Sequence, residues 1–190
     1  MKVVAFNGSP RKKGNTFQLL QTVLNEIEAE GIETELVQLS GSRLQGCIAC
    51  YGCKANPNER CAVDDDALND YVQKMIHADG IILGSPTYFR NVTAEMKALI
   101  DRAGFVARAN DSILRRKVGA AVVAVRRAGA LPVFNAINDF FFIQQMVVPG
   151  STYWNLGQGR DEGDVASDEE GMKNMVNLGQ NVAWLLKKIR

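Results

Sequence analysis

Short apolar runs alternate with longer amphipathic stretches along this chain. The apolar runs predict buried strands at residues 3–6, 34–39, 80–84, 118–125 and 146–148. In the other stretches, apolar residues recur every three or four positions. These predict helices from residue 15 to Gly31, from the acidic run 64–66 onward, and over 93–102, 132–143 and 167–190. The acidic run is placed at a helix start because carboxylates suit the positive end of the helix dipole.

Strands that alternate with helices predict an α/β protein, a three-layer sandwich with helices on both faces of a parallel sheet. Five strands fit the flavodoxin-like order 2-1-3-4-5, whose ligand lies beyond the carboxyl ends of the strands. Three loops should therefore build the site, at residues 8–16, 85–91 and 125–130. We expect a single domain over residues 1–190, with a cysteine-rich loop at about 40–63.

Composition narrows the classes of partner. The chain has 190 residues, of which 46% are hydrophobic, and its formal net charge is +1. This charge balance gives no electrostatic reason to expect a nucleic acid or an anionic membrane as a partner. No stretch approaches the roughly 18 apolar residues of a membrane span, and the N-terminal residues do not resemble a secretion signal. We therefore expect a cytoplasmic protein.

The first loop, GSPRKKGNT, has the features of a phosphate-binding turn. It is not a nucleotide P-loop, because five residues separate Gly8 from Gly14 and Asn15 stands where the lysine belongs. We expect both glycines to adopt positive φ and to let the backbone approach a ligand closely. The helix start at Asn15 would attract an anion. Additional donors would come from Ser9, Arg11 and Thr16. The alternative is an ordinary helix N-cap beside a solvated basic turn.

The motif S-P-R-x-x-G-N-T after the first strand, with G-S-P-T-Y-F-x-N after the third, resembles the NADPH-dependent FMN reductase family of the flavodoxin-like fold. The match covers nearly the whole chain, including the segments 149–155 and 168–171. The resemblance implies that the FMN phosphate is held by Ser9, Arg11, Asn15 and Thr16. It implies that the isoalloxazine ring is lined by Pro86, Thr87, Tyr88, Phe89 and Asn91. For Phe89, a place in the core is an equal alternative.

The turn after the fourth strand would face the polar edge of the flavin ring by the same resemblance. It consists of Arg126, Arg127, Ala128 and Gly129. Backbone N–H groups or an arginine there would stabilise the negative charge of reduced flavin. This chain departs from the family, in which a more glycine-rich turn is usual. The two arginines could instead receive the 2′-phosphate of NADPH or be solvated.

All four cysteines lie close together, as C-x2-C-x2-C-x7-C at Cys47, Cys50, Cys53 and Cys61. Disulfides are disfavoured in a cytosolic chain with such close spacing. Structural zinc sites usually space their ligands as two pairs. A [4Fe–4S] cluster suits the tight triple, with which the ferredoxin run also begins. The arrangement resembles the iron–sulfur flavoproteins, a branch of the same family. Zinc and metal-free thiols remain as alternatives.

The resemblance implies an FMN-dependent oxidoreductase or electron-transfer flavoprotein that carries a [4Fe–4S] cluster and uses NAD(P)H as a co-substrate. We assign no side chain as a catalytic acid or base, because the chemistry belongs to the cofactors. The lone His77 gives little support to a hydrolase. One alternative is a cluster-free NAD(P)H-dependent FMN or quinone reductase. Another is a non-catalytic flavodoxin-like electron carrier. The resemblance implies that such carriers are typically strongly acidic, whereas this chain has a formal net charge of +1, so this alternative is disfavoured.

Partners are expected to be small-molecule or protein electron donors and acceptors, with ferredoxin among them. The resemblance also implies a homodimer or homotetramer. The run Phe140–Ile143 is too apolar for an exposed helix face. It suggests either a contact between subunits or burial within one subunit.

Overall fold

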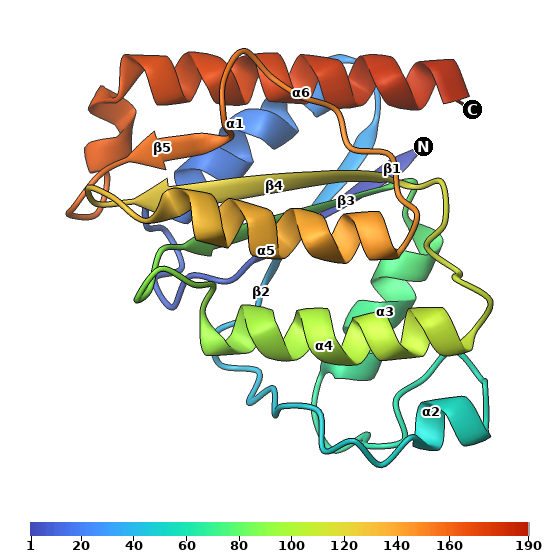
Figure 1. Cartoon of the computed structure of the whole chain (residues 1–190). Helices are drawn as coiled ribbons and strands as arrows, with labels where there is room; N and C mark the ends of the chain where they lie inside the picture. Colours follow the sequence, from blue (N-terminus) through green and yellow to red (C-terminus); the bar gives the residue numbers. More distant parts are fainter. Residues whose placement is uncertain (190) are drawn as a thin grey trace.

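A five-stranded parallel sheet forms the centre of the molecule, with helices on both faces (Figure 1). The structure, a computed structural model, describes residues 1–189. Its strand order, β2-β1-β3-β4-β5, is the predicted one. The strands are β1 (Lys2–Asn7), β2 (Glu33–Gln38), β3 (Gly80–Pro86), β4 (Val118–Val125) and β5 (Leu156–Gln158). The helices are α1 (Asn15–Ala29), α2 (Gly52–Ala55), α3 (Leu68–His77), α4 (Ala94–Ala109), α5 (Ala130–Ile143), the 3-10 turn η1 (Asp164–Ser167) and α6 (Glu169–Ile189).

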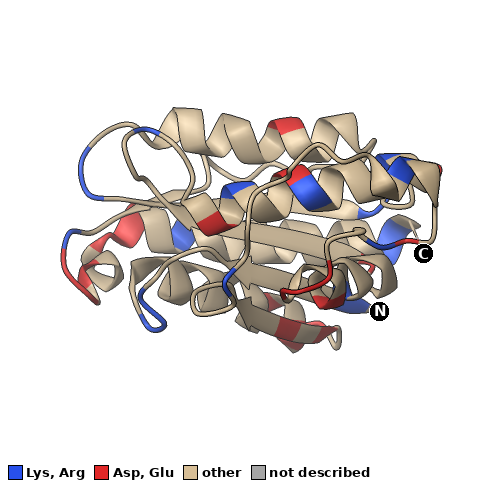
Figure 2. Cartoon of the chain, turned by 90° about the horizontal axis from the view of Figure 1, so that it is seen from below, with Lys and Arg blue, Asp and Glu red and all other residues tan. Residues whose placement is uncertain are grey.

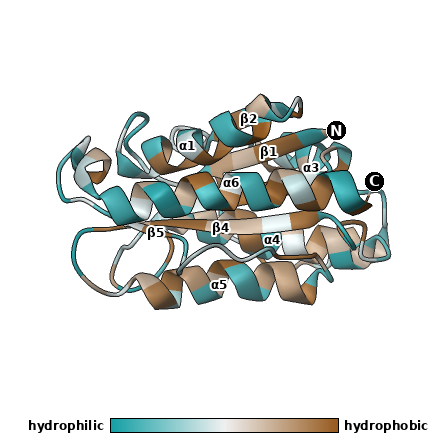
Figure 3. Cartoon of the chain, turned by 90° about the horizontal axis from the view of Figure 1, so that it is seen from above, coloured by the Kyte–Doolittle hydropathy of each residue, from teal (hydrophilic) through white to brown (hydrophobic). Residues whose placement is uncertain are grey.

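Two cores lie on opposite faces of the sheet because side chains alternate along each strand. On β1, Val3 and Ala5 pack against α1 and α6, whereas Val4 and Phe6 pack against α3 and α4. Every residue of β4 is buried, as expected for a strand covered on both faces. In Figure 3 the strand β4 is mostly brown or pale, whereas α6 alternates between hydrophilic and hydrophobic residues along its length.

The prediction for the fifth strand was wrong. Met146–Val148 does not form it; Val147 makes only an isolated bridge to Val118, at the start of β4. The fifth strand is β5, which pairs with Val123–Val125 at the other end of β4. The chain leaves the sheet edge after Val148, where Pro149 and Gly150 follow, and returns eight residues later at Leu156. Proline provides no N–H for a ladder, which accounts for this interruption.

Helix boundaries also differ from the prediction in places. The acidic run 64–66 does not begin a helix, because α3 starts at Leu68. Instead Asp66 accepts a hydrogen bond from Leu68 N at 3.1 Å and forms an ion pair with the buried Arg102. The cysteine-rich loop contains the short helix α2, which was not predicted, and α4 extends to Ala109. The predicted last helix is present as α6; Arg190 lies outside the described residues.

Basic and acidic residues are interspersed along the helices and loops (Figure 2). None of the helices within residues 1–189 has the length and apolar character needed to cross a membrane. The apolar run at the end of α5 is divided: Phe140 and Phe141 are buried, whereas Phe142 and Ile143 are more than half exposed. Half of that run therefore packs in the core and half remains at the surface.

Candidate functional site

A cleft lies at the carboxyl ends of β1, β3 and β4, where the three predicted loops meet. Its empty volume, including the solvent at its open mouth, is about 530 Å³. The predicted residues that line it are Ser9, Arg11, Asn15, Thr16, Pro86, Thr87, Tyr88 and Arg126. Gly159 and Arg160 line it as well, and the sequence analysis did not identify them. Parallel topology thus brings together residues that are far apart along the chain.

The start of α1 opens into this cleft. Its N-cap residue, Gly14, provides no side-chain hydrogen bond, and the first turn contains no acidic residue. Thr16 is 1% exposed, yet its Oγ1 has no hydrogen-bond partner. The Oγ1 of Thr87, across the cleft, is also buried without a partner. Buried hydroxyls are rarely left unpaired, so these atoms fit a ligand that carries anionic or carbonyl oxygens.

The glycines of the first loop are needed for close packing. The prediction of positive φ was wrong, because Gly14 has a φ of −71° and Gly8 is not among the glycines with positive φ. A Cβ on Gly14 would lie 2.9 Å from Cβ of Arg11, and one on Gly8 would lie 3.0 Å from the carbonyl oxygen of Gly84. Both positions therefore require the absence of a side chain, and the loop can lie close to β3.

Asn15 connects the first loop to a distant segment. Its amide nitrogen donates to the Asp161 carbonyl at 2.9 Å, and its Oδ1 accepts from the backbone nitrogens of Gly163 at 3.0 Å and Val165 at 3.4 Å. The amide is therefore engaged with the protein's own chain. Its backbone N–H at the helix start is therefore the group of Asn15 that could donate to a bound anion. These bonds also hold the segment containing Arg160 beside the cleft.

The loop after β3 ends in a tight turn. Tyr88 and Asn91 exchange two backbone hydrogen bonds, of 3.0 and 2.9 Å. The central residues Phe89 and Arg90 have φ values of 47° and 62°, a conformation that disfavours residues other than glycine. Phe89 is fully exposed, so the core alternative for it was wrong. Phe89 and Asn91 do not line the cleft, and their predicted contact with the ring stays a prediction.

The turn after β4 lies against the turn after β3. Gly129 has a φ of 90°, and a Cβ added there would be 3.1 Å from Cγ of Arg90. Arg126 lines the cleft, whereas Arg127 and Ala128 are exposed outside it. The polar edge of the site is therefore formed by three arginines, Arg11, Arg126 and Arg160.

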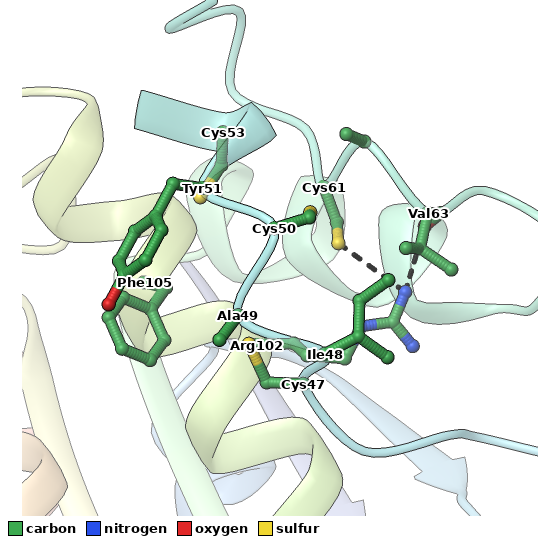
Figure 4. Close-up of a pocket in the computed structure, with 11 residues that line it drawn as sticks. Cys47, Ile48, Ala49, Cys50, Tyr51, Cys53, Cys61, Val63, Arg102 and Phe105 are labelled. Carbon is green, nitrogen blue, oxygen red and sulfur yellow. Dashed lines mark hydrogen bonds between the residues drawn. The ribbon is translucent and has the colours of Figure 1, made fainter. Parts of the chain in front are cut away.

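A second pocket brings the four thiols together (Figure 4). All four are free; Cys47 and Cys50 are exposed, while Cys53 and Cys61 are half-buried. The pKa of the Cys53 thiol is raised, mainly because the thiol is partly buried and to a lesser extent because Cys61 is nearby. Within residues 1–189, no three His, Cys, Asp or Glu side chains are arranged to hold a metal ion. All four thiols line one pocket, and thiolates are ligands of both iron–sulfur clusters and zinc, so the donor set suits either group.

Side chains from α3 and α4 hold the cysteine loop in place. Asn69 accepts from Cys61 N at 2.7 Å and donates to Cys61 O at 3.1 Å. Arg102 is buried, and its Nη2 donates to Cys61 Sγ at 3.5 Å. Tyr51 packs edge-on against Phe105 at a ring separation of 6.3 Å. Of these residues, only the cysteine was predicted from the sequence as part of a site.

Arg102 forms a buried ion pair with Asp66, in which both side chains are at most 2% exposed. Burial raises the pKa of Asp66, but hydrogen bonds from Arg102 and from the backbone of Gln45 and Leu68 outweigh it, so the net pKa is lowered. The carboxylate therefore stays ionised and neutralises the guanidinium beside the thiols.

The chain is similar in sequence to known iron-sulfur flavoproteins and in fold to a known flavodoxin. An iron-sulfur flavoprotein of Methanocaldococcus jannaschii is 41% identical over 202 aligned residues, which cover 100% of each chain. An iron-sulfur flavoprotein of Methanosarcina thermophila is 36% identical, over 100% of this chain and 97% of the relative. The crystal structure of a WrbA-like flavodoxin from Agrobacterium tumefaciens superposes with a TM-score of 0.69 at 14% identity, over 100% and 98% of the two chains. This confirms the flavodoxin-like fold.

The family described as NADPH-dependent FMN reductase matches residues 1–161. That range includes all three loops of the cleft and all four cysteines. The chain therefore belongs to the NADPH-dependent FMN reductase family.

Proposed function

We propose that this protein is an FMN-dependent oxidoreductase that carries a [4Fe–4S] cluster bound by Cys47, Cys50, Cys53 and Cys61. The observation that carries the proposal is the convergence of these four thiols on one pocket, in a fold that also has a cleft at the start of α1 lined by three arginines. The iron-sulfur flavoprotein relatives, at 32–41% identity over the full chain, support it.

The start of α1 would hold the FMN phosphate. The free backbone N–H groups of its first turn and the Thr16 hydroxyl would donate to the phosphate oxygens. Arg11 and Arg160 lie on the same cleft and would add charge-assisted bonds. The Ser9 hydroxyl accepts from Arg11 N at 3.1 Å, which fixes the shape of the loop.

The other two loops would hold the flavin ring. Thr87 supplies a second unpaired buried hydroxyl on the cleft, and Pro86 and Tyr88 provide apolar surface beside it. Arg126 would stabilise negative charge on the polar edge of the ring. Phe89 and Asn91 at the turn would contact the ring in the assembled holoprotein, as would the backbone of the turn 127–129.

Bound FMN supplies two-electron exchange with NAD(P)H, and the cluster supplies one-electron transfer to an acceptor. The residues of the chain bind, orient and stabilise charge, and no side chain acts as a proton donor or acceptor. Donors and acceptors would be small molecules or proteins such as ferredoxin, and the active form would be a homodimer or homotetramer.

The test is to purify the protein without oxygen and to measure FMN, iron and acid-labile sulfide per chain. We expect one FMN, four irons and four sulfides per chain on the stoichiometry of a [4Fe–4S] cluster, with visible absorption that bleaches on addition of NADH or NADPH. FMN without iron would refute the cluster and leave a cluster-free flavin or quinone reductase. Absence of flavin affinity would refute the proposal as a whole.

A further inference from the structure

A buried arginine on α4 connects both ends of the cysteine-rich loop. Its Nη1 donates to the carbonyl oxygen of Gln45 at 3.2 Å and to the carboxylate of Asp66. Its Nη2 donates to the carbonyl oxygen of Val63 at 2.8 Å and to Cys61 Sγ at 3.5 Å (Figure 4). Gln45 precedes the first cysteine and Val63 follows the last, so Arg102 holds the loop at both ends.

The contact with sulfur is separate from the contacts that hold the loop. Two carbonyls and one carboxylate already anchor the guanidinium, and the fork geometry of arginine directs a further N–H at the thiol. In a protein with a cluster, Cys61 is a thiolate that carries part of the cluster's negative charge. An N–H bond to a ligating sulfur, and the charge around it, tune the potential of such a centre.

We propose that Arg102 is a positioning residue for the fourth cluster ligand, and that the charge balance of Arg102 and Asp66 sets the reduction potential of the cluster. This inference rests on the proposed function. Reduction adds negative charge to the cluster, which the guanidinium stabilises and the carboxylate opposes. Removal of the positive charge of Arg102 should therefore lower the reduction potential of the cluster, and removal of the negative charge of Asp66 should raise it.

The experiment compares the wild-type holoprotein with Arg102→Gln and Asp66→Asn, all purified without oxygen. Arg108→Gln is the matched control, because Arg108 lies on the exposed side of the same helix. The readouts are the FMN and iron content, the midpoint potential of the cluster from a spectroscopic redox titration, and the rate of iron loss to a chelator.

We expect a lower cluster potential in Arg102→Gln, a higher one in Asp66→Asn, and no change in Arg108→Gln. Faster iron loss is expected in Arg102→Gln while FMN is retained. A loss of structural support alone would not shift the two potentials with opposite signs. Arg102→Lys retains the charge but cannot reach all four acceptors. Its potential should lie closer to that of the wild type than that of Arg102→Gln. If the glutamine variant does not fold, Arg102→Lys is compared with Asp66→Asn instead, and only Asp66→Asn should show a clearly higher potential than the wild type.

A wild-type protein without iron would refute the proposed function. A wild-type protein with a cluster whose potential is the same in Arg102→Gln and Asp66→Asn, or moves in the same direction in both, would overturn the inference alone.

Discussion

The unpaired hydroxyl of Thr16 provides a direct test of the flavin site. We predict that Thr16→Val increases the stability of the FMN-free protein and weakens FMN binding. The hydroxyl is buried at 1% exposure without a partner, so it destabilises the FMN-free protein. Valine has nearly the same shape and removes that unpaired group. In the holoprotein the hydroxyl would donate to a phosphate oxygen, and valine cannot.

The two effects have magnitudes that can be measured. An unpaired buried polar group costs about 1–3 kcal/mol, so the free energy of unfolding of the FMN-free variant should rise by about 1 kcal/mol or more. A hydrogen bond to a charged group contributes about 1.5–3 kcal/mol, which corresponds to a roughly 10- to 150-fold increase in the Kd for FMN. Urea denaturation measures the first quantity, and quenching of flavin fluorescence measures the second.

Thr22→Val is the control on the same helix. Thr22 Oγ1 donates to the carbonyl oxygen of Gln18 at 2.9 Å and does not line the cleft. Its Kd for FMN should equal that of the wild type. The reasoning is refuted if Thr16→Val binds FMN as tightly as the wild-type protein, or if both variants weaken binding equally.

Three further predictions concern the cluster, the packing and the response to acid. Cys61→Ser should lower the iron content of anaerobically purified protein while its FMN content remains that of the wild type. Gly179→Ala should destabilise the protein by about 1–3 kcal/mol in urea denaturation, because a Cβ there would lie 2.6 Å from the Val23 carbonyl oxygen; an unchanged midpoint would contradict this packing. The folded pKa of Asp66 is lowered, so its stabilising effect is complete above about pH 4 and is lost as the pH falls through the lowered value. Urea unfolding from pH 7 to pH 3 should show this loss in the wild type and not in Asp66→Asn.

The fold could be predicted to a large extent from local patterns. A continuous apolar run such as 118–125 has only one stable place, inside a sheet covered on both faces. The three loops of the cleft followed from that topology, since the carboxyl ends of parallel strands share one edge. Arg160 could not be found in this way, because its position depends on the bonds between Asn15 and the segment 161–165.

The fifth strand shows where local patterns are insufficient. Met146–Val148 and Leu156–Gln158 are both short segments with apolar residues, and both approach β4. What separates them is the pairing partner, which is a property of the tertiary structure. The segment 149–155 between them contains proline and glycine, which indicate a break but not on which side of it the strand lies.

For Arg102, the sequence did contain a signal of its role, namely a charged residue on a helix face that is otherwise apolar. Arg102 follows Leu99 by three positions and precedes Val106 by four, on the same face of α4, and all three residues are buried. A charged residue on an apolar helix face must find a partner of opposite charge or be excluded from the core. The acidic run 64–66 supplies that partner, since Asp66 is the only one of the three that pairs with Arg102. Asp66 therefore neutralises a buried charge beside the cysteines, and a charged residue on the buried face of α4 was the sequence signal that such a partner must exist.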